Sequence, residues 1–184
     1  VAIRNNACGP CLPVVTACAT STHAIGEAFR AIKYGHADAI ITGGAEAAIL
    51  PLAIAGFANA KALSRAEDPK YASLPFNRNR GGFVIAEGAA MLVLEEYEHA
   101  KARGAEIPGE ICGYGNTCDA YHITAPHAEA VGAANAIRLA LEEANWQGEK
   151  LYVNAHGTGT PMNDKVETLA IKKAMGEEAA RAAL

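Results

Sequence analysis

The stretch LPVVTACATSTHAIGEAFRAIKYGHADAIIT, residues 12–42, contains an apolar run, a helical pattern and a second apolar run in succession. Residues 12–15 are apolar and partly β-branched, which predicts a buried strand. Residues 22–34 predict a helix whose apolar side chains share one face, namely Ile25, Ala28, Phe29 and Ile32. Residues 37–42 predict a second buried strand, which we expect to stop at Gly43 and Gly44. The order strand, helix, strand predicts an α/β fold.

The same alternation continues along the remainder of the chain. We expect helices at residues 52–60, 97–103, 127–144 and 165–175, and strands at residues 82–85, 90–95, 107–114 and 151–154. Pro69 and Pro75 make residues 64–80 mostly loop, because proline interrupts helices and sheets alike. A helix is expected to end at Gly104 before a second strand-rich unit begins, which predicts an internal boundary near residues 103–108.

Composition excludes several classes of protein. Hydrophobic residues make up 51% of the 184 residues and charged residues 20%, which is typical of a globular domain. The net charge is −4 and the basic residues form no stripe, which argues against nucleic acid as a partner. The most apolar stretch, residues 37–60, contains Asp38, Glu46 and Pro51, which argue against a membrane span. The first residues lack the charged-then-apolar pattern of a signal peptide.

The cysteines favour a reducing, cytoplasmic location. The chain has five, an odd number, without the spacing of a secreted disulfide framework. Cys8 and Cys11 form a C-G-P-C motif, which in a redox protein opens a helix that activates the first thiol. Here the predicted strand at residues 12–15 follows instead, and no second ligand pair has zinc-finger spacing. We therefore interpret C-G-P-C as a surface turn and keep a thiol redox or non-catalytic interaction module as the alternative function.

Cys18 lies where the first predicted strand meets the predicted helix. Such a turn lifts the sulfur out of the sheet, and the helix N-terminus favours a thiolate. The backbone N–H of Cys18 can face a developing oxyanion, and small neighbours such as Ala17 and Ala19 leave room for a substrate carbonyl. The alternative is a small buried thiol without chemistry, which the residue type alone favours.

The segment NAHGTGTPMND, residues 154–164, offers a second reactive group. His156 follows a predicted strand and can transfer a proton or stabilise an oxyanion. Thr158 and Thr160 can hydrogen-bond a polar ligand, whereas the lysine of a phosphate-binding loop is absent. The alternative is a structural loop with a satisfied histidine. Together, Cys18 and His156 indicate a thiolate nucleophile with a histidine partner.

Several motifs, in order, resemble the β-ketoacyl-acyl carrier protein synthases of fatty acid and polyketide synthesis, and among them the type II condensing enzymes known as synthase II. They are TACATSTHAIG (16–26), ITGGAEA (41–47), GFANAKALS (56–64), PFNRNRGGFVIAEGAAMLVLEEYEHAKARGA (75–105), DAYHITAP (119–126) and NAHGTGTP (154–161). The resemblance covers nearly the whole chain. Thiolases and chalcone-synthase-type enzymes share the nucleophile but lack the HGTGTP loop in this form, and a chain-length factor would replace Cys18.

The resemblance implies a thiolase-like layered αβαβα architecture, present here only in part. Residues 1–106 would be the latter part of the N-terminal half, and residues 107–184 the start of the C-terminal half. A later segment with a lysine and a second histidine, and a gating segment with a phenylalanine, do not occur in this sequence. The chain would then be a central piece of a homodimeric enzyme and would not itself catalyse condensation. Gly81 and Ala86 stand where the family has aspartate and glycine, which affects local loop contacts.

The resemblance also implies residue roles. Cys18 would accept the acyl chain, and His156 would support decarboxylation of the malonyl group. Substrate would contact Thr158, Thr160, Thr124 and Phe57, while Lys61 would bind the acidic carrier protein and Asp164 and Glu167 would order the histidine loop. The partner would be acyl carrier protein bearing acyl or malonyl groups. No metal and no cofactor would be required beyond the carrier's own phosphopantetheine, and neither nucleic acid nor membrane would be a partner.

Overall fold

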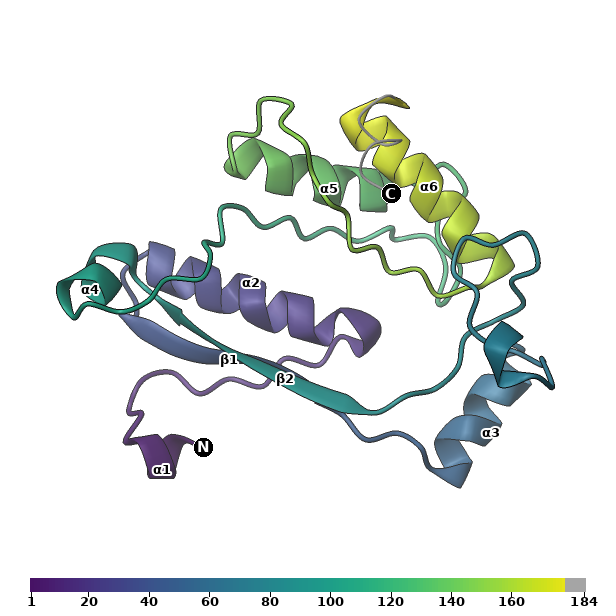
Figure 1. Cartoon of the computed structure of the whole chain (residues 1–184), viewed down its shortest axis with the longest axis horizontal. Coiled ribbons are helices and arrows are strands. Elements are labelled where there is room, and N and C mark those ends of the chain that lie inside the picture. Colours follow the sequence, from purple (N-terminus) through teal and green to yellow (C-terminus); the bar gives the residue numbers. More distant parts are fainter. Residues whose placement is uncertain (178–184) are drawn as a thin grey trace. The chain divides into compact units, whose positions relative to one another are not determined.

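The computed structural model describes residues 1–177, and its helices and strands are drawn in Figure 1. In chain order they are α1 (Ala2–Asn5), the 3-10 turn η1 (Ala17–Ala19), α2 (Thr20–Lys33), β1 (Ala39–Glu46), α3 (Pro51–Asn59), the 3-10 turn η2 (Pro69–Tyr71), β2 (Gly88–Glu95), α4 (Tyr97–Ala102), α5 (Val131–Glu143) and α6 (Pro161–Met175). The last residues of the expected C-terminal half, 178–184, lie outside the described part.

The chain divides into two compact units. Unit 1 comprises residues 1–46 and 88–111, and unit 2 comprises residues 47–87 and those from Cys112 onward. Each unit is therefore built from two separate stretches of the sequence. The expected division at residues 106 and 107, which concerns the halves of the family fold, stays a prediction.

Unit 1 is built on one antiparallel pair of strands, with α2 packed on β1 (Figure 1). The register runs from Ala39 opposite Glu95 to Glu46 opposite Gly88. The expectation that the strand stops at the glycine pair is wrong, because β1 runs through it. A Cβ on Gly44 would overlap the Ser21 side chain of α2, and one on Gly43 would overlap the Ala90 carbonyl of β2. The glycines thus let the helix and the neighbouring strand approach β1 closely.

Unit 2 has its core between α5 and α6. Both helices contribute small or branched side chains, and the buried cluster consists of Ala130, Ala134, Val166 and Ala170. Two glycines let the extended segment before α5 lie against this helix, since a Cβ on Gly113 or Gly115 would overlap the backbone of Ala140 or Ala136. The alanines of the cluster and these two glycines therefore let α5, α6 and the segment before α5 pack closely together.

The expected helices are confirmed with shifted ends, whereas several expected strands are wrong. Residues 12–15, 107–114 and 151–154 have no strand structure, and residues 82–85 contribute only a single bridge, from Phe83 to Leu63. A strand needs a hydrogen-bonded neighbour, and within residues 1–177 only β1 and β2 pair as strands of a sheet. The other apolar segments have no such strand neighbour within residues 1–177.

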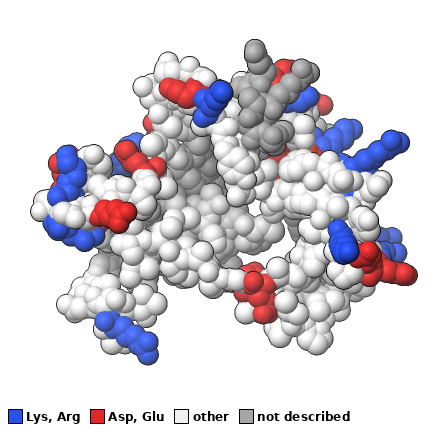
Figure 2. Space-filling model, viewed as in Figure 1, with Lys and Arg blue, Asp and Glu red and all other residues white. Residues whose placement is uncertain are grey.

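The surface carries mixed charge. On the face that Figure 2 shows, acidic and basic side chains lie interspersed among neutral ones. Unit 1 exposes large apolar side chains on β2, of which Val93 is the most accessible, with 67% of its surface exposed. None of the helices within residues 1–177 is long and apolar enough to cross a membrane.

The end of β2 carries an ion cluster that predicts acid sensitivity of unit 1. Glu95 accepts from Arg103 through both oxygens, at 2.8 and 2.6 Å, and its Oε1 lies 2.6 Å from His99 Nδ1. Arg103 first, and then His99, holds the pKa of Glu95 at about 2 instead of its ordinary 4.5. A lowered carboxyl pKa stabilises the fold above the unfolded-state pKa, and this stabilisation is lost as pH falls from about 4.5 towards about 2.

We therefore expect E95Q to lower the free energy of unfolding at pH 6, with the difference from wild type shrinking as pH falls through that window. Denaturant titrations between pH 6 and pH 2 measure this difference. The control is E98Q, because Glu98 forms an exposed pair with Lys101 and should show little pH-dependent difference. Parallel pH profiles for wild type and E95Q would contradict the prediction.

Candidate functional site

Cys18 lies in a tight turn that leads directly into α2. It is the central residue of η1, its side chain is exposed, and the preceding Ala17 has a left-handed φ of 52°. The Thr16 N–H donates to Thr20 Oγ1 at 2.8 Å, and the Thr20 hydroxyl donates to the Ala17 carbonyl at 2.8 Å. The expected turn before a helix is therefore present, although an extended segment precedes it instead of a strand.

His23 was missed by sequence reasoning. Its Nδ1 lies 2.8 Å from the Thr16 hydroxyl, so it holds the residue that begins the Cys18 turn. The only sequence signal is its position on α2, five residues after Cys18, where it can reach back over the first helical turn. Thr16, Thr20 and His23 together fix the backbone that presents the thiol.

The His156 loop in unit 2 is held by a carboxylate from α6. Glu167 accepts the His156 N–H at 2.6 Å through one oxygen and the Gly157 N–H at 2.9 Å through the other. Gly157 has a φ of 52°, a conformation that favours glycine. Glu167 therefore binds the backbone and not the ring, and the His156 side chain remains exposed.

The two threonines and Asp164 connect this loop to the start of α6. Thr158 Oγ1 and Thr160 Oγ1 lie 2.9 Å apart, and Thr160 caps α6 by accepting the Asn163 N–H at 3.2 Å. Asp164 is only 2% exposed and accepts the N–H groups of Gly159, at 3.1 Å, and Phe76, at 2.7 Å. The cap explains why α6 begins at Pro161, four residues before the expected start.

Arg80 is a further residue that sequence reasoning missed. Its guanidinium donates to the carbonyls of Thr160, at 3.2 Å, and Pro161, at 2.7 Å. Its Nε also lies 3.6 Å from Asp164 Oδ2. A separation of 80 residues gives no local signal for this pairing.

The remaining predicted site residues of unit 2 are Phe57, Lys61 and Thr124. Phe57 on α3 contacts Phe83 edge-on, with ring centroids 5.2 Å apart, and Lys61 follows α3 with a left-handed φ of 54°. Thr124 lies in an exposed loop, where its N–H donates to His122 Nδ1 at 3.1 Å. The structure thus gathers one group of the predicted residues at the start of α6: His156, Thr158, Thr160, Asp164 and Glu167. Cys18 belongs to unit 1.

The C-G-P-C motif lacks the helix that would activate it. Residues 7–16 contain no helix or strand, and α1 ends before Cys8 instead of beginning there. Cys8 and Cys11 are both free and exposed. No group of three or more metal-binding side chains is clustered within residues 1–177.

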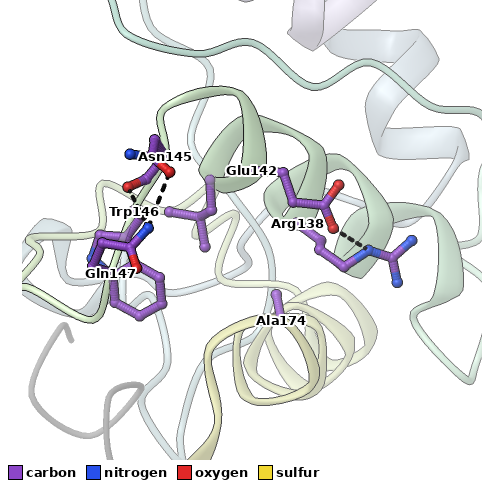
Figure 3. Close-up of a pocket in the computed structure, with 7 residues that line it drawn as sticks. Arg138, Glu142, Asn145, Trp146, Gln147 and Ala174 are labelled. Carbon is purple, nitrogen blue, oxygen red and sulfur yellow. Dashed lines mark hydrogen bonds and ion pairs between the residues drawn. The ribbon is translucent and has the colours of Figure 1, made fainter.

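A recess of about 350 Å³ lies beside the end of α5 and includes Ala174 of α6 (Figure 3). Its lining is formed by Arg138, Leu141, Glu142, Asn145, Trp146, Gln147 and Ala174. Arg138 and Glu142 pair with each other at 3.2 Å. None of the predicted site residues lines this recess.

Comparison with known proteins matches almost the entire chain. The family model for the beta-ketoacyl synthase N-terminal domain matches residues 1–100, and that for the C-terminal domain matches residues 108–184. The 3-oxoacyl-[acyl-carrier-protein] synthase 2 of Synechocystis sp. is 55% identical over 180 residues, 97% of this chain and 43% of that protein. The protein of the same name from Vibrio cholerae is 52% identical over 171 residues, 92% of this chain and 41% of that protein.

Solved structures that resemble this chain are ketosynthases as well. A ketosynthase complex, described as a type II PKS acyl-carrier protein with its ketosynthase bound to the hexaketide, matches with a TM-score of 0.91 at 40% identity, over 96% of this chain and 44% of the other. A beta-ketoacyl synthase from Burkholderia phymatum STM815 matches with a TM-score of 0.88 at 42% identity, over 96% and 43%. The expected partial α/β architecture is confirmed. The chain spans less than half the length of these relatives.

Proposed function

Because the chain belongs to the beta-ketoacyl synthase family, we propose that the protein it forms part of is a condensing enzyme of fatty acid elongation. It would join an acyl group to a malonyl group carried by acyl carrier protein and release a 3-oxoacyl-acyl carrier protein. The observation that carries this proposal is the exposed Cys18 in the turn at the N-terminal end of α2, within a sequence 55% identical to a named 3-oxoacyl synthase.

The first step is acyl transfer to Cys18. The thiolate attacks the carbonyl carbon of the acyl thioester on the carrier, a C–S bond forms at Cys18, and the carrier thiolate leaves. The turn before α2 supports this role, since it presents the exposed Cys18 side chain at the start of the helix. The small side chains on either side, Ala17 and Ala19, leave space for the approaching thioester.

The second step is decarboxylative condensation. The malonyl thioester loses carbon dioxide when the bond between its carboxylate and its α-carbon breaks, and the electron pair passes into an enolate. The enolate carbon attacks the acyl-Cys18 carbonyl, a C–C bond forms, and the Cys18 thiolate leaves. His156 would stabilise the enolate oxygen, because Glu167 holds its backbone while leaving the imidazole exposed.

The other assignments follow from the same reaction. Thr158, Thr160 and Thr124 would bind the phosphopantetheine arm of the carrier, Phe57 would line the acyl pocket and Lys61 would bind the acidic carrier surface. Asp164 and Glu167 would order the histidine loop. No further cofactor takes part in this scheme. We also propose a homodimer in the cytoplasm, where a reducing environment suits five cysteines that lack the spacing of a secreted disulfide framework.

Elongation in polyketide synthesis is the second candidate function. It is favoured by the match to the type II PKS ketosynthase in complex with its acyl-carrier protein. The two candidates share both chemical steps and differ in the acyl chain, so fatty acyl and polyketide thioesters distinguish them. The higher identity to the 3-oxoacyl synthases, 55% against 40%, favours fatty acid elongation.

The test uses the complete protein encoded by the reading frame. After incubation with acyl carrier protein bearing a saturated acyl group, intact mass spectrometry should show one acyl mass added, and peptide mapping should locate it on Cys18. Adding malonyl carrier should then remove the acyl mass from the protein and yield a 3-oxoacyl carrier. Acylation spread over several of the five cysteines, or no acylation, would refute the proposal.

A further inference from the structure

The segment comprising residues 74–83 forms the backing of the His156 loop within unit 2. The Gly82 N–H donates to the Gly159 carbonyl at 3.0 Å, and the Phe76 N–H donates to Asp164 at 2.7 Å. A Cβ on Gly157 would lie 3.3 Å from the Phe76 ring, so this ring packs closely against the loop backbone. The loop is therefore held by Glu167 of α6 and by this backing segment.

Arg80 is the one side chain of the backing segment whose guanidinium reaches the start of α6. It donates to Thr160 and Pro161 as described above, and its Nη1 donates to the carbonyl of Asn77 at 3.1 Å. The side chain is 20% exposed and faces the nearly buried Asp164 carboxylate. One guanidinium thus joins the turn of the backing segment to the cap of α6.

The positive charge of Arg80 lies at the N-terminal end of α6, where it does not stabilise the helix. A cation at a helix N-terminus opposes the helix dipole, so Arg80 gains nothing from the dipole of α6. Its carbonyl acceptors and Asp164 offset that cost. Arg80 binds the carbonyl of Thr160. The hydroxyl of the same Thr160 lies 2.9 Å from Thr158 Oγ1. The contacts of Arg80 therefore fix Thr160, the residue that precedes α6 and belongs to the proposed site.

We propose that Arg80 is a positioning residue for the His156 loop, acting through the carbonyls of Thr160 and Pro161 and through Asp164. This inference rests on the proposed function, because it assigns the loop to the decarboxylation step. Arg80 has no part in acyl transfer to Cys18. Its loss should shift the loop backbone and slow the step that uses His156, since small displacements of a catalytic group are costly.

The experiment compares R80M, R80K and the matched control R78M in the complete protein, since Arg78 is exposed and lies two residues away. Two half-reactions are measured separately: acyl transfer to Cys18, and release of carbon dioxide from malonyl carrier. We expect R80M to slow decarboxylation about 10-fold or more while acylation changes less than about 2-fold. R80K should fall between wild type and R80M, because an ammonium cannot bind both carbonyls as the guanidinium fork does.

A second measurement does not depend on activity. Amide hydrogen exchange of Gly159 and Phe76, whose N–H groups donate to Asp164, should accelerate about 10-fold in R80M, or in R80K if R80M does not fold. Amides of β1 and β2 in unit 1 serve as the internal control. Unchanged exchange, unchanged decarboxylation or an equal loss of both half-reactions would overturn the inference. A wild-type protein that performs neither half-reaction would refute the proposed function, while the exchange measurement would still decide whether Arg80 holds the loop.

Discussion

Replacing Cys18 by alanine is expected to abolish condensation, with a loss of at least about 10³-fold, because the proposed reaction carries the acyl chain as a thioester on Cys18. The acyl mass should no longer appear on the protein when the variant is incubated with acyl carrier. Release of carbon dioxide from malonyl carrier should persist, since the proposed chemistry assigns that step to the His156 loop. Intact mass spectrometry and a carbon dioxide release assay measure the two effects independently.

The matched control for this variant is C11A. Cys11 is a free, exposed cysteine that belongs to the C-G-P-C motif. We expect C11A to retain both half-reactions, because residues 7–16 contain no helix that would activate its thiol. A loss of activity in C11A, with activity retained in C18A, would reverse the assignment and favour a function centred on C-G-P-C.

The helices and the two paired strands, β1 and β2, could be predicted from the sequence, whereas the other expected strands were wrong. Helical periodicity in a sequence indicates which face of a helix is buried. The ends of α2 lie within two residues of the expected ones, because the backbone hydrogen bonds of a helix join residues close in the sequence. An apolar run such as residues 12–15 reports only that the segment tends to be extended. Whether it becomes a strand depends on a partner from elsewhere in the sequence. Only β1 and β2 pair in this way within residues 1–177.

The candidate site shows the same division between local and distant contacts. His156 and Glu167 are 11 residues apart in one loop and helix, and the Glu167 carboxylate accepts the His156 N–H. That this acid orders the loop is implied by the resemblance and stays a prediction. Arg80 and His23 were missed for different reasons. Arg80 meets Thr160 across 80 residues, which no spacing rule covers. His23 is near Cys18 in the sequence, but its contact with Thr16 depends on how the turn before α2 folds back.

Replacing Asp164 by alanine should strongly destabilise the protein, with a loss of about 3 kcal/mol or more in the free energy of unfolding. The carboxylate is 2% exposed and is the acceptor for the Gly159 and Phe76 N–H groups. Alanine would leave both donors without their acceptor and would remove the carboxylate that faces the Arg80 guanidinium. Unsatisfied buried donors and an unpaired cation are among the largest single costs in a protein.

Urea denaturation measures this loss, and two variants define its origin. D164N keeps the side-chain volume and one acceptor oxygen but places an amide NH₂ against the second donor, so it should lie between wild type and D164A. D68A removes an exposed aspartate that accepts the local Lys70 N–H, at 2.9 Å, and should cost less than about 1 kcal/mol. Equal losses in D164A and D68A would contradict the role of Asp164 as the buried acceptor that joins the backing segment, the His156 loop and α6.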